Sequence, residues 1–336
     1  MALFRVRNTD SEYSASPRYQ TTRGHVQTSP EREAVIIRSG NSKILNTRSL
    51  MSDSRPEVLT EEDVLRLFPV LGGERRLTRR LLKALKITDI NAVHARHINL
   101  RGAEFAHAAL TDPAINVCYR LHGAEHLEEM RKGGAFTTVS NHPFGSLDGI
   151  MLIDIIGSVR PDYSVLVNGF LSMISCLRDS FIPVAPPKGM AGGLDSKHNV
   201  SGVKEVLNRL QNGQPVGFFP AGGISVYKGN RNRVMDSEWQ ASCAKMILVS
   251  QVPVYPIFFS GRNSWYFHFL GWLSWAIRTP RIPAELFNKR GHIFDVYIGD
   301  PIPPETIARF EKNPRELALF LYDRTYRLAP GHKKNK

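Results

Sequence analysis

The spacing of apolar residues changes along the chain and divides it into stretches of different character. Residues 1–55 show almost no regular apolar spacing, whereas leucine, valine and phenylalanine recur every three or four residues between positions 61 and 85. Such spacing places apolar side chains on one face of a helix. A further helix is predicted over residues 91–110. The pattern therefore predicts an N-terminal helical segment over residues 56–112.

After Pro113, short runs rich in β-branched and aromatic residues alternate with helical patterns. Strands are predicted at residues 115–121, 136–140, 164–167, 181–185, 216–219, 254–259 and 293–298. The clearest helices are predicted at residues 146–156, 200–211, 237–250 and 314–328. Strands separated by helices are typical of a mixed sheet with helices packed on it. The predicted fold class is α/β, with a mostly parallel sheet flanked by helices in one domain over residues 113–330.

The N-terminal stretch is rich in serine, threonine, arginine and asparagine. Such a segment cannot bury enough apolar surface to offset the entropy lost on ordering. Residues 1–55 are therefore expected to form a disordered tail. Met51 begins a sequence that is itself typical of a natural N-terminus, so an alternative start at Met51 would leave residues 1–50 outside the natural protein.

Charge and cysteine content narrow the classes of function. The 336 residues include 44 Lys and Arg against 31 Asp and Glu, a formal charge of +13, which favours an anionic partner such as nucleic acid, a membrane surface or an acidic substrate. Cys118, Cys176 and Cys243 lie too far apart in sequence for a disulfide framework and fit a reducing compartment. No apolar run reaches the roughly 18 residues of a spanning helix, and no signal peptide is recognisable. A cytoplasmic location is expected.

Candidate chemistry lies where the predicted strand at residues 136–140 ends. The following residues read NHPFGSLDG and place His142 in a loop and Asp148 at the start of the next helix. A histidine whose tautomer is fixed by a carboxylate is a common general base. Ser146 can cap this helix, and a negative charge in its first turn is favourable. The alternative is a loop histidine beside a helix-capping acid, with no catalytic role.

Three blocks of sequence resemble motifs of the glycerolipid and lysophospholipid acyltransferase superfamily. NHPFGSLD resembles its first motif, in which a histidine and an aspartate lie four residues apart. FPAGGIS at residues 219–225 resembles its Phe-Pro-Glu-Gly-Thr-Arg-Ser block, and VPVYPI at residues 252–257 matches its Val-Pro-aliphatic-x-Pro block. The blocks occur in the family order, each at a predicted strand end. The resemblance covers about residues 115–302 and marks the α/β domain as an acyltransferase domain.

Two departures from the family pattern narrow what the resemblance implies. Five residues, not four, separate His142 from Asp148, so the pair can meet only if His142 lies in the loop, where Gly145 tolerates unusual backbone angles. The glutamate and arginine of the family's third block, thought to grip a glycerol phosphate, are Ala221 and Ile224 here. The resemblance is therefore closest to haemolysin-like and lyso-ornithine-lipid-type members, with an acceptor such as an amino acid or a lyso-amino-acid lipid.

The resemblance implies transfer of a fatty acyl group from a thioester donor to a hydroxyl or amine of a lipid or lipid precursor. The donor would be a thioester of acyl carrier protein or coenzyme A, used as a co-substrate, and neither a metal nor a bound cofactor is expected. His142 is the implied general base, and Asp148 orients it and stabilises the imidazolium.

Residues near the third block are candidates for substrate binding. They are Gly222, Gly223, Ser225, Lys228, Arg231 and Arg233. The glycines can present backbone N–H groups to an anion or a developing oxyanion, and the basic residues can supply a replacement anion site. The alternatives are a tight turn and a solvated basic loop.

An aromatic run at residues 265–277, WYFHFLGWLSWAI, is too short to span a bilayer but suits a helix at its surface. Trp265, Trp272 and Trp275 are the predicted membrane contacts, and the protein is expected to associate peripherally with the inner face of the membrane. The alternative is a buried core helix.

The competing function is that of a non-enzymatic basic protein that binds nucleic acid or anionic lipid. Its support is the net charge. However, the positive charge is scattered, and no nucleic-acid motif with interleaved stacking aromatics occurs. No nucleic-acid partner is therefore expected.

Overall fold

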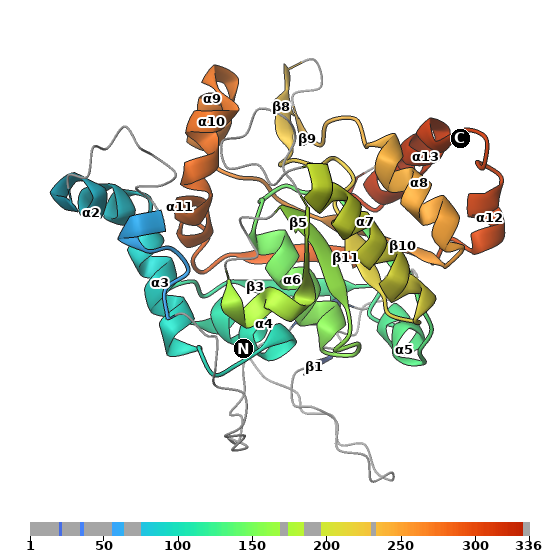
Figure 1. The fold of residues 1–336 in the computed structure, drawn as a ribbon, viewed down its shortest axis with the longest axis horizontal. Coiled ribbons are helices and arrows are strands. Elements are labelled where there is room, and N and C mark those ends of the chain that lie inside the picture. The colour runs from blue at the N-terminus through green and yellow to red at the C-terminus, as the bar shows by residue number, and fades with distance from the viewer. Residues whose placement is uncertain are drawn as a thin grey trace, which may run out of the picture.

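A central sheet organises the molecule (Figure 1). The computed structural model describes residues 20–21, 34–36, 56–63, 75–168, 174–184, 196–229 and 233–331 of the chain. In these residues the strand order of the sheet is β1-β2-β3-β11-β10-β4-β7-β5-β6. Its main part consists of β3 (Cys118–His122), β11 (Ile293–Ile298), β10 (Val254–Phe259), β4 (Thr137–Ser140), β7 (Val216–Phe218), β5 (Ser164–Asn168) and β6 (Phe181–Val184). All seven predicted strands are present.

The main part of the sheet is parallel except at one pair of strands. β4 lies between β10 and β7 and is parallel to both, with Val139 opposite Pro256 on one side and Phe218 on the other. β10 and β11 are antiparallel, and β11 is parallel to β3. The predicted fold class, α/β with a mostly parallel sheet flanked by helices, is confirmed.

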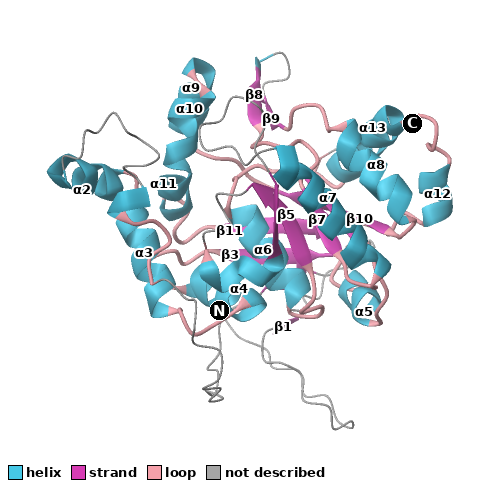
Figure 2. Ribbon diagram, viewed as in Figure 1, coloured by secondary structure: helices cyan, strands magenta, loops and turns pink. Residues whose placement is uncertain are grey.

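Helices cover the sheet on both faces, as Figure 2 shows. They are α2 (Arg75–Ala84), α3 (Ile87–Arg96), α4 (Gly102–Thr111), α5 (His126–Arg131), α6 (Leu147–Gly157), α7 (Ser196–Gln211), α8 (Ala241–Ser250), α9 (Trp265–Leu273), α10 (Trp275–Arg278), α11 (Ile282–Phe287), α12 (Pro304–Ala308) and α13 (Pro314–Tyr326). A separate two-stranded hairpin, β8 (Val226–Lys228) and β9 (Arg233–Met235), lies outside the sheet.

Two hydrophobic cores lie on opposite faces of the sheet because successive strand residues point to opposite faces. In β10, Tyr255 and Ile257 belong to the core that also holds α4 and α6, whereas Val254 belongs to the core that holds α7, α8 and α13. Every residue of α6 is buried. Such burial is expected of a helix that is apolar around most of its circumference, and α6 carries the candidate acid, Asp148, in its first turn.

Two predicted helices are each divided into two, which corrects the prediction. The helix predicted at residues 91–110 is divided into α3 and α4. Gly102, the first residue of α4, has φ at +51°, which interrupts a continuous helix. Arg96 and His97, at the end of α3, both bind Asp112, which follows α4. The aromatic run forms α9 and α10, because Ser274 between them has an extended backbone.

Two short strands occur in the N-terminal range that was expected to be disordered. β2 (Ala34–Ile36) pairs antiparallel with β3 at the sheet edge, and β1 (Gln20–Thr21) pairs with β2. The other positions of residues 1–55 lie outside the described residues, so the expected disorder and the alternative start at Met51 stay predictions.

Candidate active site

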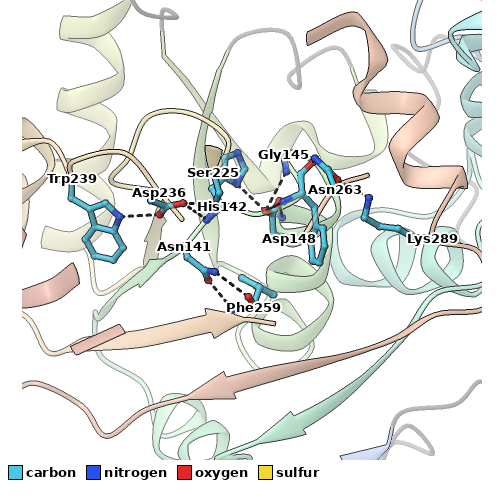
Figure 3. A network of polar contacts seen from close by, with 12 residues as sticks. Asn141, His142, Gly145, Asp148, Ser225, Asp236, Trp239, Phe259, Asn263 and Lys289 are labelled. Carbon is cyan, nitrogen blue, oxygen red and sulfur yellow. Dashed lines mark hydrogen bonds and ion pairs between the residues drawn. The ribbon is translucent and has the colours of Figure 1, made fainter. Parts of the chain in front are cut away.

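The candidate site lies at the carboxyl ends of three neighbouring strands. β4 leads into NHPFGSLD, β7 leads into FPAGGIS, and β10 ends at Phe259, immediately before residues 260–264. Because these strands are parallel, their carboxyl ends meet at one edge of the sheet, where binding sites of open α/β sheets form. Figure 3 shows the polar network that results.

Asn141 fixes the point at which the loop leaves the sheet. Its side-chain amide donates to the backbone oxygen of Phe259 at 3.0 Å and accepts from the Phe259 N–H at 2.8 Å. These two hydrogen bonds clamp the ends of β4 and β10 together. His142, the next residue, therefore starts from a fixed position.

His142 and Asp148 form a close pair. Nδ1 of His142 lies 3.0 Å from Oδ2 of Asp148, whose side chain is fully buried, while 13% of the His142 side chain remains exposed. This contact falls outside the geometry of a well-formed hydrogen bond, and it becomes an ion pair when the imidazole is protonated. Because Nδ1 faces the acid, Nε2 is the ring nitrogen left for a substrate.

The loop between the two residues is folded around the carboxylate. Phe144 and Gly145 donate their backbone N–H groups to Oδ2 of Asp148 at 3.0 and 3.3 Å, and Gly149 donates to Oδ1. Gly145 has φ at +90°, a conformation that accommodates the extra residue of this loop. Ser146 occupies the N-cap position of α6, but its side chain makes no capping hydrogen bond.

The charges of the pair shift both pKa values in complementary directions. Burial lowers the pKa of His142, but the negative charge of Asp148 and a smaller effect of Asp236 outweigh it, and the pKa is raised overall. Burial raises the pKa of Asp148, but His142 and the N–H donors of the loop lower it more. Asp148 is thus held as a carboxylate and favours a protonated His142.

The turn after β7 packs against the histidine. The ring of Phe219 lies 4.1 Å from the imidazole, centre to centre. The Gly222 N–H donates to the Phe219 oxygen at 3.0 Å and is therefore engaged in the turn itself. Gly223 is exposed, and no described backbone group accepts its N–H. Of the two glycines predicted to bind substrate, Gly223 is therefore the one whose backbone N–H is not used in a described backbone hydrogen bond.

Ser225 is buried and braces the His142 loop. Its N–H donates to the His142 carbonyl at 2.9 Å, and its hydroxyl donates to Asp236. Lys228 and Arg233 lie opposite each other in the β8–β9 hairpin, with Arg233 exposed. Arg231 lies outside the described residues. The substrate-binding roles of these residues stay predictions.

Sequence reasoning missed Asp236, which lies beside His142. The Asp236 side chain accepts from the His142 N–H at 3.2 Å, from the Ser225 hydroxyl and from Nε1 of Trp239 at 2.9 Å. Burial raises its pKa, although these donors oppose the shift. The only sequence signal was an acid three residues before a tryptophan, which matches no motif.

A buried lysine on the other side of the loop was also missed. Nζ of Lys289 donates to Asn263 at 2.6 Å, and Asn263 donates to the backbone oxygen of Phe144 at 3.1 Å. Burial lowers the pKa of Lys289 to about 8, although Glu285 and Asp148 oppose the shift. Lys289 and Asn263 thus connect the end of α11 to the loop that folds around the Asp148 carboxylate. In the described part of the chain, no group of three His, Cys, Asp or Glu side chains could hold a metal ion.

The aromatic helix α9 exposes most of its rings. Trp265 and Trp272 are 76% and 80% exposed, and Phe269, partly exposed, stacks on Trp265, whereas Phe267 is fully buried. The alternative of a buried core helix is therefore wrong for these two tryptophans; the Trp275 side chain lies outside the described residues. None of the described helices is both long and apolar enough to cross a bilayer.

Several known proteins are similar to this chain. A family model described as acyltransferase matches residues 66–331. Lyso-glycine lipid O-acyltransferases of Phocaeicola vulgatus and Bacteroides thetaiotaomicron are each 28% identical over 60% of this chain, covering 71% and 73% of their own lengths. The crystal structure of the 1-acyl-sn-glycerophosphate acyltransferase from Thermotoga maritima aligns with a TM-score of 0.41 and 15% identity, over 78% of this chain and 88% of that chain.

Proposed function

The chain belongs to the acyltransferase family, within the glycerolipid and lysophospholipid acyltransferase superfamily, and we propose that it transfers a fatty acyl group from a thioester to the hydroxyl of a lyso-amino-acid lipid. The proposed reaction takes place at a membrane surface. It is an acyltransferase of lipid substrates, so the non-enzymatic alternative is wrong. The observation that carries the proposal is the His142–Asp148 pair at the sheet edge, in which Nδ1 faces the acid and no contact of Nε2 with the described residues is seen.

In the proposed mechanism, Nε2 of His142 takes the proton of the acceptor hydroxyl as its oxygen attacks the thioester carbonyl. Asp148 stabilises the imidazolium that forms. The tetrahedral intermediate then collapses: the new C–O bond is retained, the C–S bond breaks, and the thiolate leaves. The imidazolium can return its proton to the thiolate. We assign stabilisation of the developing oxyanion to the Gly223 N–H, because the Gly222 N–H is engaged in the turn.

The acceptor is inferred from two observations. Ala221 and Ile224 replace the charged residues that the resemblance assigns to gripping a glycerol phosphate, and Ile224 lies against Gly145 of the loop. An apolar side chain there favours an acceptor without a phosphate. Relatives named lyso-glycine lipid O-acyltransferases support an amino-acid lysolipid with a free hydroxyl.

The proposed donor and the proposed site of action are supported by features of the molecular surface. Acyl carrier protein and coenzyme A thioesters both carry a phosphate-bearing pantetheine arm, and Lys228 and Arg233 on the β8–β9 hairpin offer it positive charge. The exposed rings of α9 suit contact with a bilayer, from which a lysolipid has to be taken.

The proposal is tested by supplying the purified protein with acyl-carrier-protein or coenzyme A thioesters and a panel of lysolipids. The expected result is diacyl product from a lyso-glycine lipid and little from 1-acyl-glycerol phosphate, measured by mass spectrometry. His142→Ala is the matched inactive control. Preference for the phosphate acceptor would overturn the proposed acceptor, and absence of transfer to every lysolipid would overturn the proposed function.

A further inference from the structure

We propose that Asp236 is a positioning residue for the reaction, which holds the backbone of His142 while Asp148 holds its ring. The inference rests on the proposed function in one respect only, that His142 is the base. In Figure 3, His142 lies between the two carboxylates, with Asp236 and Trp239 on one side and Asp148 on the other. Two acids from distant parts of the chain thus act on different parts of the same residue.

The contacts of Asp236 form a closed ring with the His142 peptide. The His142 N–H donates to Oδ1 of Asp236 at 3.2 Å, and the Ser225 hydroxyl donates to the same oxygen. The Ser225 N–H donates to the His142 carbonyl at 2.9 Å. The backbone of His142 is therefore held from both its N–H and its C=O group. An error of about 1 Å in the placement of a catalytic group can lower the rate about 100-fold.

Asp236 is itself held by elements that do not form the site. Nε1 of Trp239, whose ring belongs to the core beneath α8 and α13, donates to Oδ2 at 2.9 Å. The hydroxyl of Tyr326, in the last turn of α13, accepts the Asp236 N–H at 2.8 Å. The first contact holds the carboxylate of Asp236 and the second holds its backbone, so Asp236 and, through it, His142 are fixed relative to the core.

The carboxylate also acts on the histidine by its charge. Asp236 is 3% exposed, and burial raises its pKa, while the His142 N–H, the Ser225 hydroxyl and the Trp239 Nε1–H stabilise its ionised form. The charged groups that face His142 in the described residues are Asp148 on α6 and Asp236 after β9, while Lys289 on the α11 side faces Asp148. A negative charge at Asp236 favours the imidazolium, so its loss lowers the pKa of His142.

The experiment compares Asp236→Asn with a matched control, Asp154→Asn. Both replace a buried carboxylate, but Asp154 lies six residues after Asp148 on α6, where it accepts from the Tyr119 hydroxyl at 2.8 Å and lies close to His107. The His142 pKa is measured by NMR titration of its ring carbon, identified by the signal that is missing in His142→Ala. This readout does not depend on activity, so it separates failure of the inference from failure of the proposed function.

The expected result is a downward shift of the His142 pKa and a fall in kcat of about 10- to 100-fold for Asp236→Asn, with KM little changed. The acid limb of the rate profile should move to lower pH with it. Asp154→Asn should leave both the pKa and the limb in place, even if it lowers the melting temperature. A folded Asp236→Asn protein with an unshifted pKa and kcat within threefold of the parent overturns the inference.

In Asp236→Asn the NH₂ group of the new side chain can face the Trp239 N–H. Two hydrogen-bond donors would then oppose each other, so a second variant is needed. Asp236→Asn combined with Trp239→Phe removes that conflict, and the same shift is expected. If neither variant folds, Asp236 acts through the fold and not through His142, and the inference is wrong.

Discussion

The charges of His142 and Asp148 interact electrostatically, and burial strengthens this interaction. The carboxylate is fully buried and accepts from three backbone N–H groups, two in the preceding loop and one in the first turn of α6. Such donors keep it ionised although burial alone would neutralise it. The imidazole is only slightly exposed, so the positive charge that it gains during transfer is matched by a fixed negative charge rather than by water. Separate substitutions of His142 and Asp148 are therefore needed to distinguish their roles.

Replacing His142 with alanine should abolish transfer while the protein stays folded. Loss of a general base typically costs two to four orders of magnitude in rate, roughly 100- to 10,000-fold. The fold should survive because the His142 side chain lies at the sheet edge, whereas its backbone contacts to Asp236 and Ser225 remain. Single-turnover rates and a thermal melt check the prediction. A variant that turns over at near-normal rate would show that His142 is not the base.

Replacing Asp148 with asparagine should lower both the rate and the pH at which activity is lost. The base works as neutral imidazole, so activity falls as the pH drops through the His142 pKa, which Asp148 raises. Without that charge the pKa falls, and the acid limb of kcat moves to lower pH. A limb that stays in place, or moves to higher pH, would contradict the electrostatic role. Asp154→Asn again serves as the control.

Sequence reasoning could predict the half of this site that is local in the chain. Asp148 lies six positions after His142, and a loop, a glycine and a helix start suffice to bring them together. Asp236 lies 94 residues away in sequence, and only the sheet order places it against His142. Lys289 reaches the loop through Asn263 in the same way. No spacing rule connects such residues without the fold.

At the scale of elements, helix α9 combines an anchored start with an exposed apolar face. Ser264 caps it by accepting from the Phe267 N–H at 3.1 Å, and Ser264 in turn donates to the buried Glu285. Phe267 is fully buried, while the two outward tryptophans are mostly exposed. The helix is thus fixed by its polar cap and one ring, and its remaining rings are left for another surface.

Replacing Trp265 and Trp272 with serine should weaken binding to phosphatidylglycerol-containing vesicles at least about tenfold. Each aromatic ring moved out of water contributes about 1.5–3 kcal/mol, and about 1.4 kcal/mol already corresponds to a factor of ten. The circular dichroism spectrum and the melting temperature should not change, because both rings are mostly exposed in the folded protein. Vesicle cosedimentation measures the effect.

A matched control uses exposed apolar residues outside that helix. Val249 on α8 and Leu319 on α13 are 66% and 54% exposed, and their double replacement by serine should leave vesicle binding intact. Equal loss in both double variants would mean that vesicle binding is not specific to α9. Unchanged binding without the tryptophans would contradict the proposed membrane contact.

The prediction of elements failed where a pattern was too short or was interrupted. The β8 and β9 strands have three residues each and lie in the charged sequence VYKGNRNRVM, which has no clean alternation. The break between α3 and α4 depends on Asp112 receiving two side chains from the preceding helix, a contact outside the range of helical periodicity.

For the whole molecule, the strand order separates the N-terminal edge from the site. β1 and β2 lie beyond β3 and β11, whereas the candidate site is built on β10, β4 and β7. The sequence predicted the seven main strands because each is a short run rich in β-branched and aromatic residues. It could not predict their order, because the order depends on which strands pair across long stretches of chain. The position of an edge strand therefore decides how its loss affects the site.

Removing residues 1–50 should change neither activity nor stability appreciably. The described part of this segment contributes five strand residues at one sheet edge, and two strands separate that edge from β10. For a domain of this size about 1 kcal/mol corresponds to roughly 2–4 °C, so we expect a melting temperature within about 2 °C of the parent and unchanged turnover. Removing residues 1–33 alone retains β2 and serves as the comparison. A loss of more than about 5 °C in the longer truncation alone would assign a structural role to β2 on the β3 edge. A loss of turnover without a change in melting temperature would instead place part of the segment at the substrate.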